Sequence, residues 1–209
     1  GMENTSTSQY YVKKSDDDKN VYLVDSSAVE PFMGTLYDFA ESGTFPSVTS
    51  STITEVKVDK EDGYELTQDP DNLFWNISDG KTSERADTDK AGTVTSAIGS
   101  LSYDSFVDYN CTDDSKYGFD DPYAVITAKY TEEEAVEDES STDSDTEDDS
   151  KEAETKTVDK EITIYVGDET GSDRYVKVND SKEVYTITED SLTDILDSTV
   201  SDFYSLSVN

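Results

Sequence analysis

The stretch that decides the fold lies near the C-terminal end of the chain and reads ITIYVGDETGSDRYVKVNDSKEVYTIT (residues 162–188). It begins with alternating side chains, which put Ile162, Ile164 and Val166 on one face of a predicted strand. Gly, Asp and Ser then cluster in residues 167–173, a composition that favours a turn. This part of the chain therefore predicts a strand that enters an antiparallel sheet.

A hairpin and a helix complete the stretch. Residues 174–178 and 184–187 are rich in β-branched and aromatic side chains and predict two antiparallel strands. Thr188 is a residue type that favours the start of a helix. The predicted helix has one apolar stripe, formed by Leu192, Ile195, Leu196, Thr199, Val200 and Phe203.

The same pattern occurs near the N-terminus, where YVKK (11–14) and VYLV (21–24) match YVKV (175–178) and VYTI (184–187). An amphipathic helix is predicted next, with Pro31 in its opening turn and Gly43 just past its end. Neither hairpin-helix unit can bury its apolar face alone, so the match predicts tandem packing units. A chance match of a common motif is the alternative. The predicted stripe of the first helix consists of Val29, Phe32, Met33 and Leu36.

The middle of the chain predicts further antiparallel strands and one more helix. Asp62-Gly63 is a hairpin signal between two strands, and a third strand follows the turn at residues 69–72. Asp87 is a good cap for a helix whose stripe is Val94, Ala97, Ile98 and Leu101. The strands predicted here cover residues 52–58, 64–67, 73–77, 106–109 and 123–130.

These elements predict an α+β fold of antiparallel sheets built from hairpins, with three amphipathic helices in tandem hairpin-helix units. Residues 1–45 form the first unit, and residues 50–209 form a larger α+β unit. Residues 131–160 are dominated by Asp and Glu. Such a segment cannot bury enough apolar surface to offset its ordering entropy, so a flexible insertion is predicted there.

Charge excludes several partners. The formal net charge is −34. Nucleic-acid binding depends largely on Lys and Arg that neutralise phosphates, and anionic lipid headgroups repel an acidic surface for the same reason. Cations, basic proteins and neutral polymers remain open as ligands, and solubility alone is the simplest role of the charge.

Absent residue types exclude several chemistries. The chain has no histidine and one cysteine, Cys111. Histidine-based nucleophilic catalysis, His-ligated metal sites and an internal disulfide are thereby ruled out. Asp148 stands where a calcium-binding loop needs glycine, so no specific calcium site is predicted among residues 143–154. No catalytic, cofactor-binding or metal-binding residue is assigned.

Six short segments have a characteristic order along the chain: LFWNI (73–77), AD (86–87), YGFDDP (117–122), IYVG (164–167), RYV (174–176) and VY (184–185). In these segments the chain resembles the bacterial domain-of-unknown-function family numbered 4340. The resemblance implies one full copy of the family repeat over residues 52–205 and the tail of a preceding copy over residues 10–40. It also implies an extracytoplasmic envelope protein with a membrane or lipid anchor, some relatives lying beside transporter components of the gliding-motility type.

Three functional hypotheses follow. The first is a non-enzymatic envelope module that binds or scaffolds another protein, attached to the membrane only through an anchor outside this sequence. The second is a glycan- or peptide-binding module, for which Trp75 and the tyrosines offer aromatic rings. On alternating strands, such rings more often pack in the core or against a neighbouring strand. The third is a hydrolase that uses two carboxylates, which needs a carboxyl group of raised pKa in a pocket.

Overall fold

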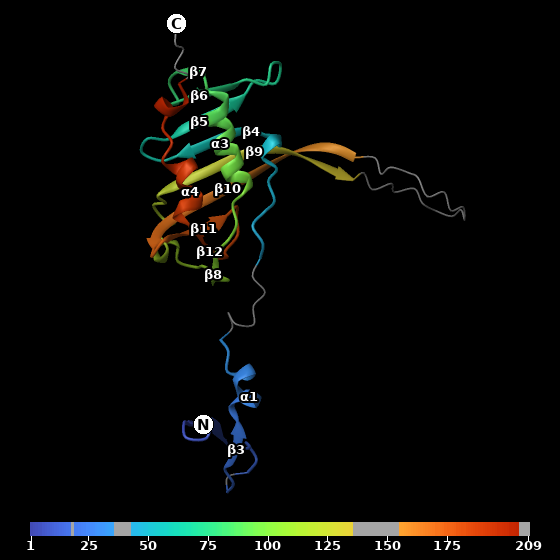
Figure 1. Ribbon diagram of the computed structural model, residues 1–209, viewed down its shortest axis with the longest axis vertical. Coiled ribbons are helices and arrows are strands. Elements are labelled where there is room, and N and C mark those ends of the chain that lie inside the picture. Colours follow the sequence, from blue (N-terminus) through green and yellow to red (C-terminus); the bar gives the residue numbers. More distant parts are fainter. Residues whose placement is uncertain (18, 36–42, 136–154, 205–209) are drawn as a thin grey trace, which may run out of the picture. The chain divides into compact units, whose positions relative to one another are not determined.

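The computed structural model describes residues 1–17, 19–35, 43–135 and 155–204. The chain divides into two compact units, Gly1–Gly43 (unit 1) and Thr44–Asn209 (unit 2). Both units are antiparallel sheets combined with short helices (Figure 1). The predicted α+β class with antiparallel sheets is thus confirmed.

Unit 1 is a three-stranded sheet followed by a short helix. Strands β1 (Glu3–Asn4), β2 (Gln9–Val12) and β3 (Tyr22–Asp25) pair antiparallel in that order. Helix α1 covers only Ser26–Val29 and continues as a 3-10 helix over Glu30–Phe32.

The prediction of a long amphipathic helix after β3 is wrong in two respects. The α-helix ends at Val29, because Pro31 has no N–H to donate to the helical ladder. Its expected stripe is not buried: Phe32 is 84% exposed and Met33 54% exposed. Leu36, the last predicted member of the stripe, lies outside the described residues.

Unit 2 contains a nine-stranded sheet in the described ranges, with the order β7-β6-β5-β4-β9-β10-β11-β12-β8. Every neighbouring pair is antiparallel, and the hairpin predicted at Asp62-Gly63 joins β4 to β5. The strands are β4 (Ile53–Asp59), β5 (Tyr64–Gln68), β6 (Trp75–Ser78), β7 (Ser83–Arg85), β8 (Ser105–Asp108), β9 (Ala124–Ala135), β10 (Thr155–Thr170), β11 (Asp173–Val178) and β12 (Val184–Thr188).

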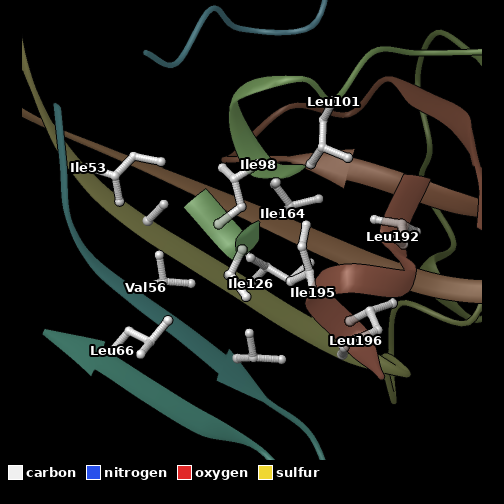
Figure 2. Close-up of a cluster of buried hydrophobic side chains, with 14 of the residues drawn as sticks. Ile53, Val56, Leu66, Ile98, Leu101, Ile126, Ile164, Leu192, Ile195 and Leu196 are labelled. Atoms are coloured by element: carbon white, nitrogen blue, oxygen red, sulfur yellow. The ribbon is translucent and has the colours of Figure 1, made fainter. Parts of the chain in front are cut away.

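Two helices, α3 (Thr88–Gly99) and α4 (Glu189–Leu196), pack on one face of this sheet (Figure 1). Asp87 caps α3 as predicted, since its Oδ1 accepts hydrogen bonds from the N–H groups of Asp89 and Lys90 at 2.9 and 3.1 Å. Figure 2 shows the resulting core, in which helix side chains such as Ile98 and Ile195 lie over strand residues such as Ile126.

The C-terminal stripe is divided between two elements instead of one helix. Helix α4 ends at Leu196, and a separate 3-10 helix covers Val200–Phe203. The second element starts with its own capping box, because the Asp202 carboxylate accepts from the N–H of Thr199 and the Thr199 side chain accepts from the N–H of Asp202. Phe203 is completely buried, so the predicted stripe does mark core residues across the break.

The prediction of a flexible insertion over residues 131–160 is wrong at both ends of that range. Strands β9 and β10 continue into it and pair from Thr131–Asp159 to Ala135–Thr155, which makes a two-stranded ribbon that extends beyond the sheet (Figure 1). Cross-strand charge pairing explains this, since Lys160 Nζ lies 4.0 Å from Glu132 Oε2 and also pairs with Glu134. The acidic residues 136–154 lie outside the described residues.

Deletion of residues 132–157 should change the free energy of unfolding of unit 2 by less than about 1 kcal/mol. The described residues of this segment are exposed or half-buried, so their removal takes away little buried surface. Urea unfolding of the full chain and the deletion variant, followed by Trp75 fluorescence, measures the difference. A loss of more than about 2 kcal/mol would show that the segment packs on the sheet.

Stability should fall as the pH rises from 10 to 12. Burial raises the pKa of Tyr103 from 10.0 to about 12, with smaller contributions from Tyr185 and Glu183. Burial also raises the pKa of Tyr64, whose hydroxyl donates to the Ile195 carbonyl at 2.9 Å. The folded state therefore holds these protons more tightly than the unfolded chain, and the stability present below pH 10 is lost above it. Urea unfolding at each pH, with Tyr64→Phe as the comparison, tests this; a flat profile contradicts it.

Candidate functional site

The face of the sheet opposite the two helices carries a second, smaller core. It lies where residues 109–123 cross from β8 to β9 over the strands between them. Alternation along β10 and β11 directs Tyr165, Tyr175 and Lys177 to this side. The buried members of this core are Cys111, Tyr117, Phe119 and Val184, with Val107, Tyr165 and Tyr175 packed against them.

Lys177 is the central cation of this region. Its Nζ lies 2.7 Å from Asp114 Oδ1, and it lies 5.0 Å from the ring centroid of Phe119 and 5.6 Å from that of Tyr165. The side chain of Lys177 is only 16% exposed. The hydrogen bond from Lys177 is the main cause that lowers the pKa of Asp114. The charge of this partly buried lysine is thus paired with a carboxylate of the same chain.

A second polar group connects the crossover to β8. The Tyr117 hydroxyl donates to Asp108 Oδ2 at 2.8 Å and accepts from Lys116 Nζ at 2.6 Å. The N–H of Asn110 is the largest cause that lowers the pKa of Asp108, and burial raises the pKa of Tyr117. These contacts hold the crossover against the sheet edge.

A shallow cavity of about 360 Å³ opens beside Lys177, and we call it the lysine–aromatic pocket. Its wall combines two rings with charges of both signs, so it suits a polar ligand that presents an apolar edge. The lining residues are Cys111, Asp114, Phe119, Tyr165, Lys177, Asn179, Asp180, Ser181 and Lys182.

The pKa shifts of the described carboxyl groups all have the same direction. A glycosidase-type acid needs a raised pKa. Every described carboxyl group whose pKa departs from its ordinary value has a lowered pKa, and these are Asp17, Asp79, Asp108, Asp114, Glu134 and Asp202.

Metal binding finds no support in the described ranges, where no group of three or more His, Cys, Asp or Glu side chains could hold an ion. The calcium-loop pattern at residues 143–154 lies outside these ranges.

Cys111 should react slowly with thiol reagents in the folded protein. It is 7% exposed, and burial is the first cause that raises its pKa, which lowers the thiolate fraction at neutral pH. We expect labelling by a disulfide reagent to be at least about tenfold slower in the native chain than in urea. Equal rates in the two states would show that the crossover does not cover the thiol.

The segments that carry the family resemblance meet in the structure around two glycines. Gly118 has a φ of +77°, in the region that favours glycine. A Cβ on Gly167 would lie 2.0 Å from the carbonyl oxygen of Tyr117. That same carbonyl accepts the N–H of Asp168 at 2.9 Å. The YGFDDP and IYVG segments are therefore in direct backbone contact, which fastens the crossover to β10.

Arg174 forms a second junction between these segments, on the helix side of the sheet. It is 6% exposed, and its guanidinium carbon lies 3.9 Å from the ring centroid of Tyr123. Its Nη2 lies 2.6 Å from Glu169 Oε1 and 3.3 Å from Glu189 Oε1. The quoted motif residues thus join β10, β11, α4 and the crossover.

Of the two roles that the sequence leaves open for Trp75, the structure confirms packing in the core, since Trp75 is 6% exposed and belongs to the main core. Sequence reasoning assigned no ligand-binding residue and missed the lysine–aromatic pocket. Its members are far apart in the chain, and the alternation that places Tyr165 and Lys177 on one face was the only signal available.

Comparison with known proteins gives one match. The sequence profile of the family described as "Domain of unknown function (DUF4340)" matches residues 1–122, which includes all of unit 1 and continues to the end of the YGFDDP segment. Neither the curated proteins nor the solved structures contain a match to this chain. Since the profile covers more than half of the 209 residues, the chain belongs to the DUF4340 family.

Proposed function

We propose that this chain is a non-enzymatic binding or scaffolding module of the bacterial cell envelope, in an extracytoplasmic location, and that it is built from tandem copies of one repeat. The observation that carries the proposal is that the two hairpin-helix units have the same strand register. The residue types suggested the repeat, and the shared strand register supports it.

The register match covers both hairpins completely. The sequence alignment equates Tyr11 with Tyr175 and Leu23 with Thr186, and these residues are partners in their own hairpins. A one-residue slip would turn every side chain to the other face, so a shared register means a shared division into faces. The equivalent pairs are Gln9–Asp25 and Asp173–Thr188, Tyr10–Val24 and Arg174–Ile187, Tyr11–Leu23 and Tyr175–Thr186, and Val12–Tyr22 and Val176–Tyr185.

The equivalence extends to the neighbouring elements on both sides. Glu3 pairs with Tyr10, and Glu169 pairs with the equivalent Arg174, so β1 matches the end of β10. The residues that precede the two helices, Asp25 and Thr188, are also equivalent. The strand pairing of unit 1 therefore matches that of residues 169–188 of unit 2, and each hairpin is followed by a helix, which is shorter in unit 1.

Repetition of a packing unit is typical of proteins that present extended surfaces to partners. The carboxyl pKa values and the internally balanced lysine support a role without catalysis. The net charge of −34 disfavours nucleic acid as a partner. An envelope protein is the partner that the family resemblance implies.

Among the described residues, no helix combines the length and apolar content that a bilayer crossing requires. In this proposal, membrane attachment uses an anchor outside the 209 residues.

Affinity capture from the envelope fraction of the producing organism tests the proposal. The full chain is the bait, the 132–157 deletion is the second bait, and an unrelated protein of similar net charge is the control. Recovery of one envelope protein by both baits, but not by the control, supports a module that binds through its folded units. Fractionation with an antibody to unit 2 tests the location, and a cytoplasmic signal would contradict it.

The lysine–aromatic pocket favours a second candidate, a module that binds a glycan or a short peptide. Tyr165 and Phe119 offer ring surfaces there, and Lys182 and Asn179 offer donors. A glycan and peptide array probed with the full chain and with Tyr165→Ala tests it. Signals that are equal for the two proteins would remove this pocket as the binding site.

A further inference from the structure

We infer that the open edge of β3 and the apolar face of α1 in unit 1 form an acceptor surface for the missing half of a repeat. The occupant is a preceding segment of the same polypeptide that folds like residues 44–168. The inference rests on the proposed tandem organisation and adds to it the surface, the occupant and the residues in contact.

In unit 2, the strand edge and the helix face equivalent to this surface are covered by other elements of the same unit. The outer edge of β12 pairs with β8, and Tyr185 lies opposite Phe106. Tyr103 stacks on Tyr185 with ring centroids 3.7 Å apart. The face formed by β11, β12 and α4 is covered by α3 and the central strands, so its side chains are 0–4% exposed, and these are Val176, Ile187, Leu192, Ile195 and Leu196.

Within unit 1, the equivalent surfaces are not covered by other described residues of that unit. Within the described residues, β3 pairs with β2 alone, and its outer edge has no neighbouring strand. Tyr22, the counterpart of Tyr185, is 42% exposed. Phe32 and Met33, the counterparts of Ile195 and Leu196, are 84% and 54% exposed. An apolar face of this kind next to a free strand edge is a typical interaction surface.

The equivalence also defines the chemistry of the occupant. It supplies a strand like β8 that pairs with Val21, Tyr22 and Leu23, and aromatic side chains that pack on Tyr22 as Tyr103 packs on Tyr185. It supplies an apolar helix like α3 to cover Phe32 and Met33. Its last strand, like β10, runs directly into Glu3, the counterpart of Glu169.

A second copy of this chain does not provide these elements. In each copy, β8 is already paired with β12, and the apolar face of α3 is already buried by the core of its own unit 2. Opening unit 2 to release them would expose that core. The complement must therefore come from a repeat copy that has no C-terminal half of its own, and a segment joined to Glu3 meets this condition.

The test is an extended chain in which residues 44–168 are placed directly before Glu3, in front of the otherwise unchanged sequence. Hydrogen exchange of residues 22–25 and oxidation of Met33 by peroxide are compared between the extended and the original chain. We expect exchange at least about a hundredfold slower and oxidation at least about tenfold slower in the extended chain, because both groups become buried. The matched control carries Val94→Asp and Ile98→Asp in the added segment only, and it should exchange and oxidise like the original chain.

Unchanged exchange and oxidation in the extended chain would overturn the inference. Concentration-dependent dimerisation of the original chain with protection of Met33, measured by analytical ultracentrifugation and oxidation, would also overturn it in favour of a second copy. The outcome is separable from the envelope-capture experiment. If the extended chain is protected but no envelope partner is captured, the acceptor surface is supported and the scaffold role is refuted. If an envelope partner is captured but the extended chain is not protected, the scaffold role is supported and the acceptor surface is refuted.

Discussion

Replacing Gly167 with alanine should lower the free energy of unfolding of unit 2 by about 3 kcal/mol, the upper end of typical overpacking costs. The new Cβ would lie 2.0 Å from the backbone carbonyl oxygen of Tyr117 and 3.0 Å from a ring carbon of Phe119. The clash is with backbone, which cannot rotate away as the end of a flexible side chain can. Relief requires the crossover to move off β10, and the hydrogen bond from Asp168 N–H to Tyr117 would weaken with it.

Urea unfolding followed by the fluorescence of Trp75 measures this effect, because Trp75 is the only tryptophan and belongs to the core of unit 2. Gly92→Ala is the matched control. Gly92 lies inside α3 with no atom within 4 Å of a new Cβ, so alanine should stabilise the protein by roughly 0.5–1 kcal/mol. A Gly167→Ala variant as stable as the wild type would refute the close backbone contact between the two family segments.

Replacing Phe203 with alanine should cost about 3–5 kcal/mol, the usual range for a fully buried phenylalanine. Phe203 is 0% exposed, and its ring centroid lies 5.0 Å from that of Tyr64. It comes from the short 3-10 helix after α4, so it joins the C-terminal end of the described chain to the core. The cavity left by the ring would have rigid strands around it and could collapse only partly.

The same unfolding experiment with Phe74→Ala provides the comparison. Phe74 is 42% exposed, and it stacks on the guanidinium of Arg85 at 3.6 Å. Its loss should cost no more than about 1 kcal/mol, since exposed cation–π contacts contribute little. Similar losses for the two variants would mean that the segment 200–203 is not anchored in the core.

These two results bear on function as well as on stability. The segments quoted for the family resemblance contain Gly118, Gly167 and Arg174, of which only Gly118 lies within the matched residues 1–122, and all three make contacts that hold the crossover and the sheet together. If Gly167→Ala unfolds unit 2, the family segments describe a fold requirement. A ligand site would then have to be sought on the lysine–aromatic pocket or on the acceptor surface of unit 1.

Local sequence patterns predicted an element correctly where the residues that stabilise it are close together in the sequence. The Asp87 cap depends on N–H groups two and three residues away, and the hairpin at Asp62-Gly63 depends on its own turn. The α4 stripe was read correctly as core but wrongly as one helix. The capping box at Thr199 and Asp202 begins a separate 3-10 helix, and the spacing of the apolar residues alone does not predict this start.

By itself, the sequence determined the antiparallel α+β class, the family, the absence of histidine chemistry and the hairpin-helix match, because these depend on residue types and short spacings. Only the tertiary structure decided that the two hairpins share one register, and that Phe32 is exposed while its counterpart Ile195 is buried. Only the tertiary structure showed that Asp114 and Phe119 lie beside Lys177. The physical reason is that burial and pocket geometry depend on strands paired across long separations, which neither propensity nor periodicity records.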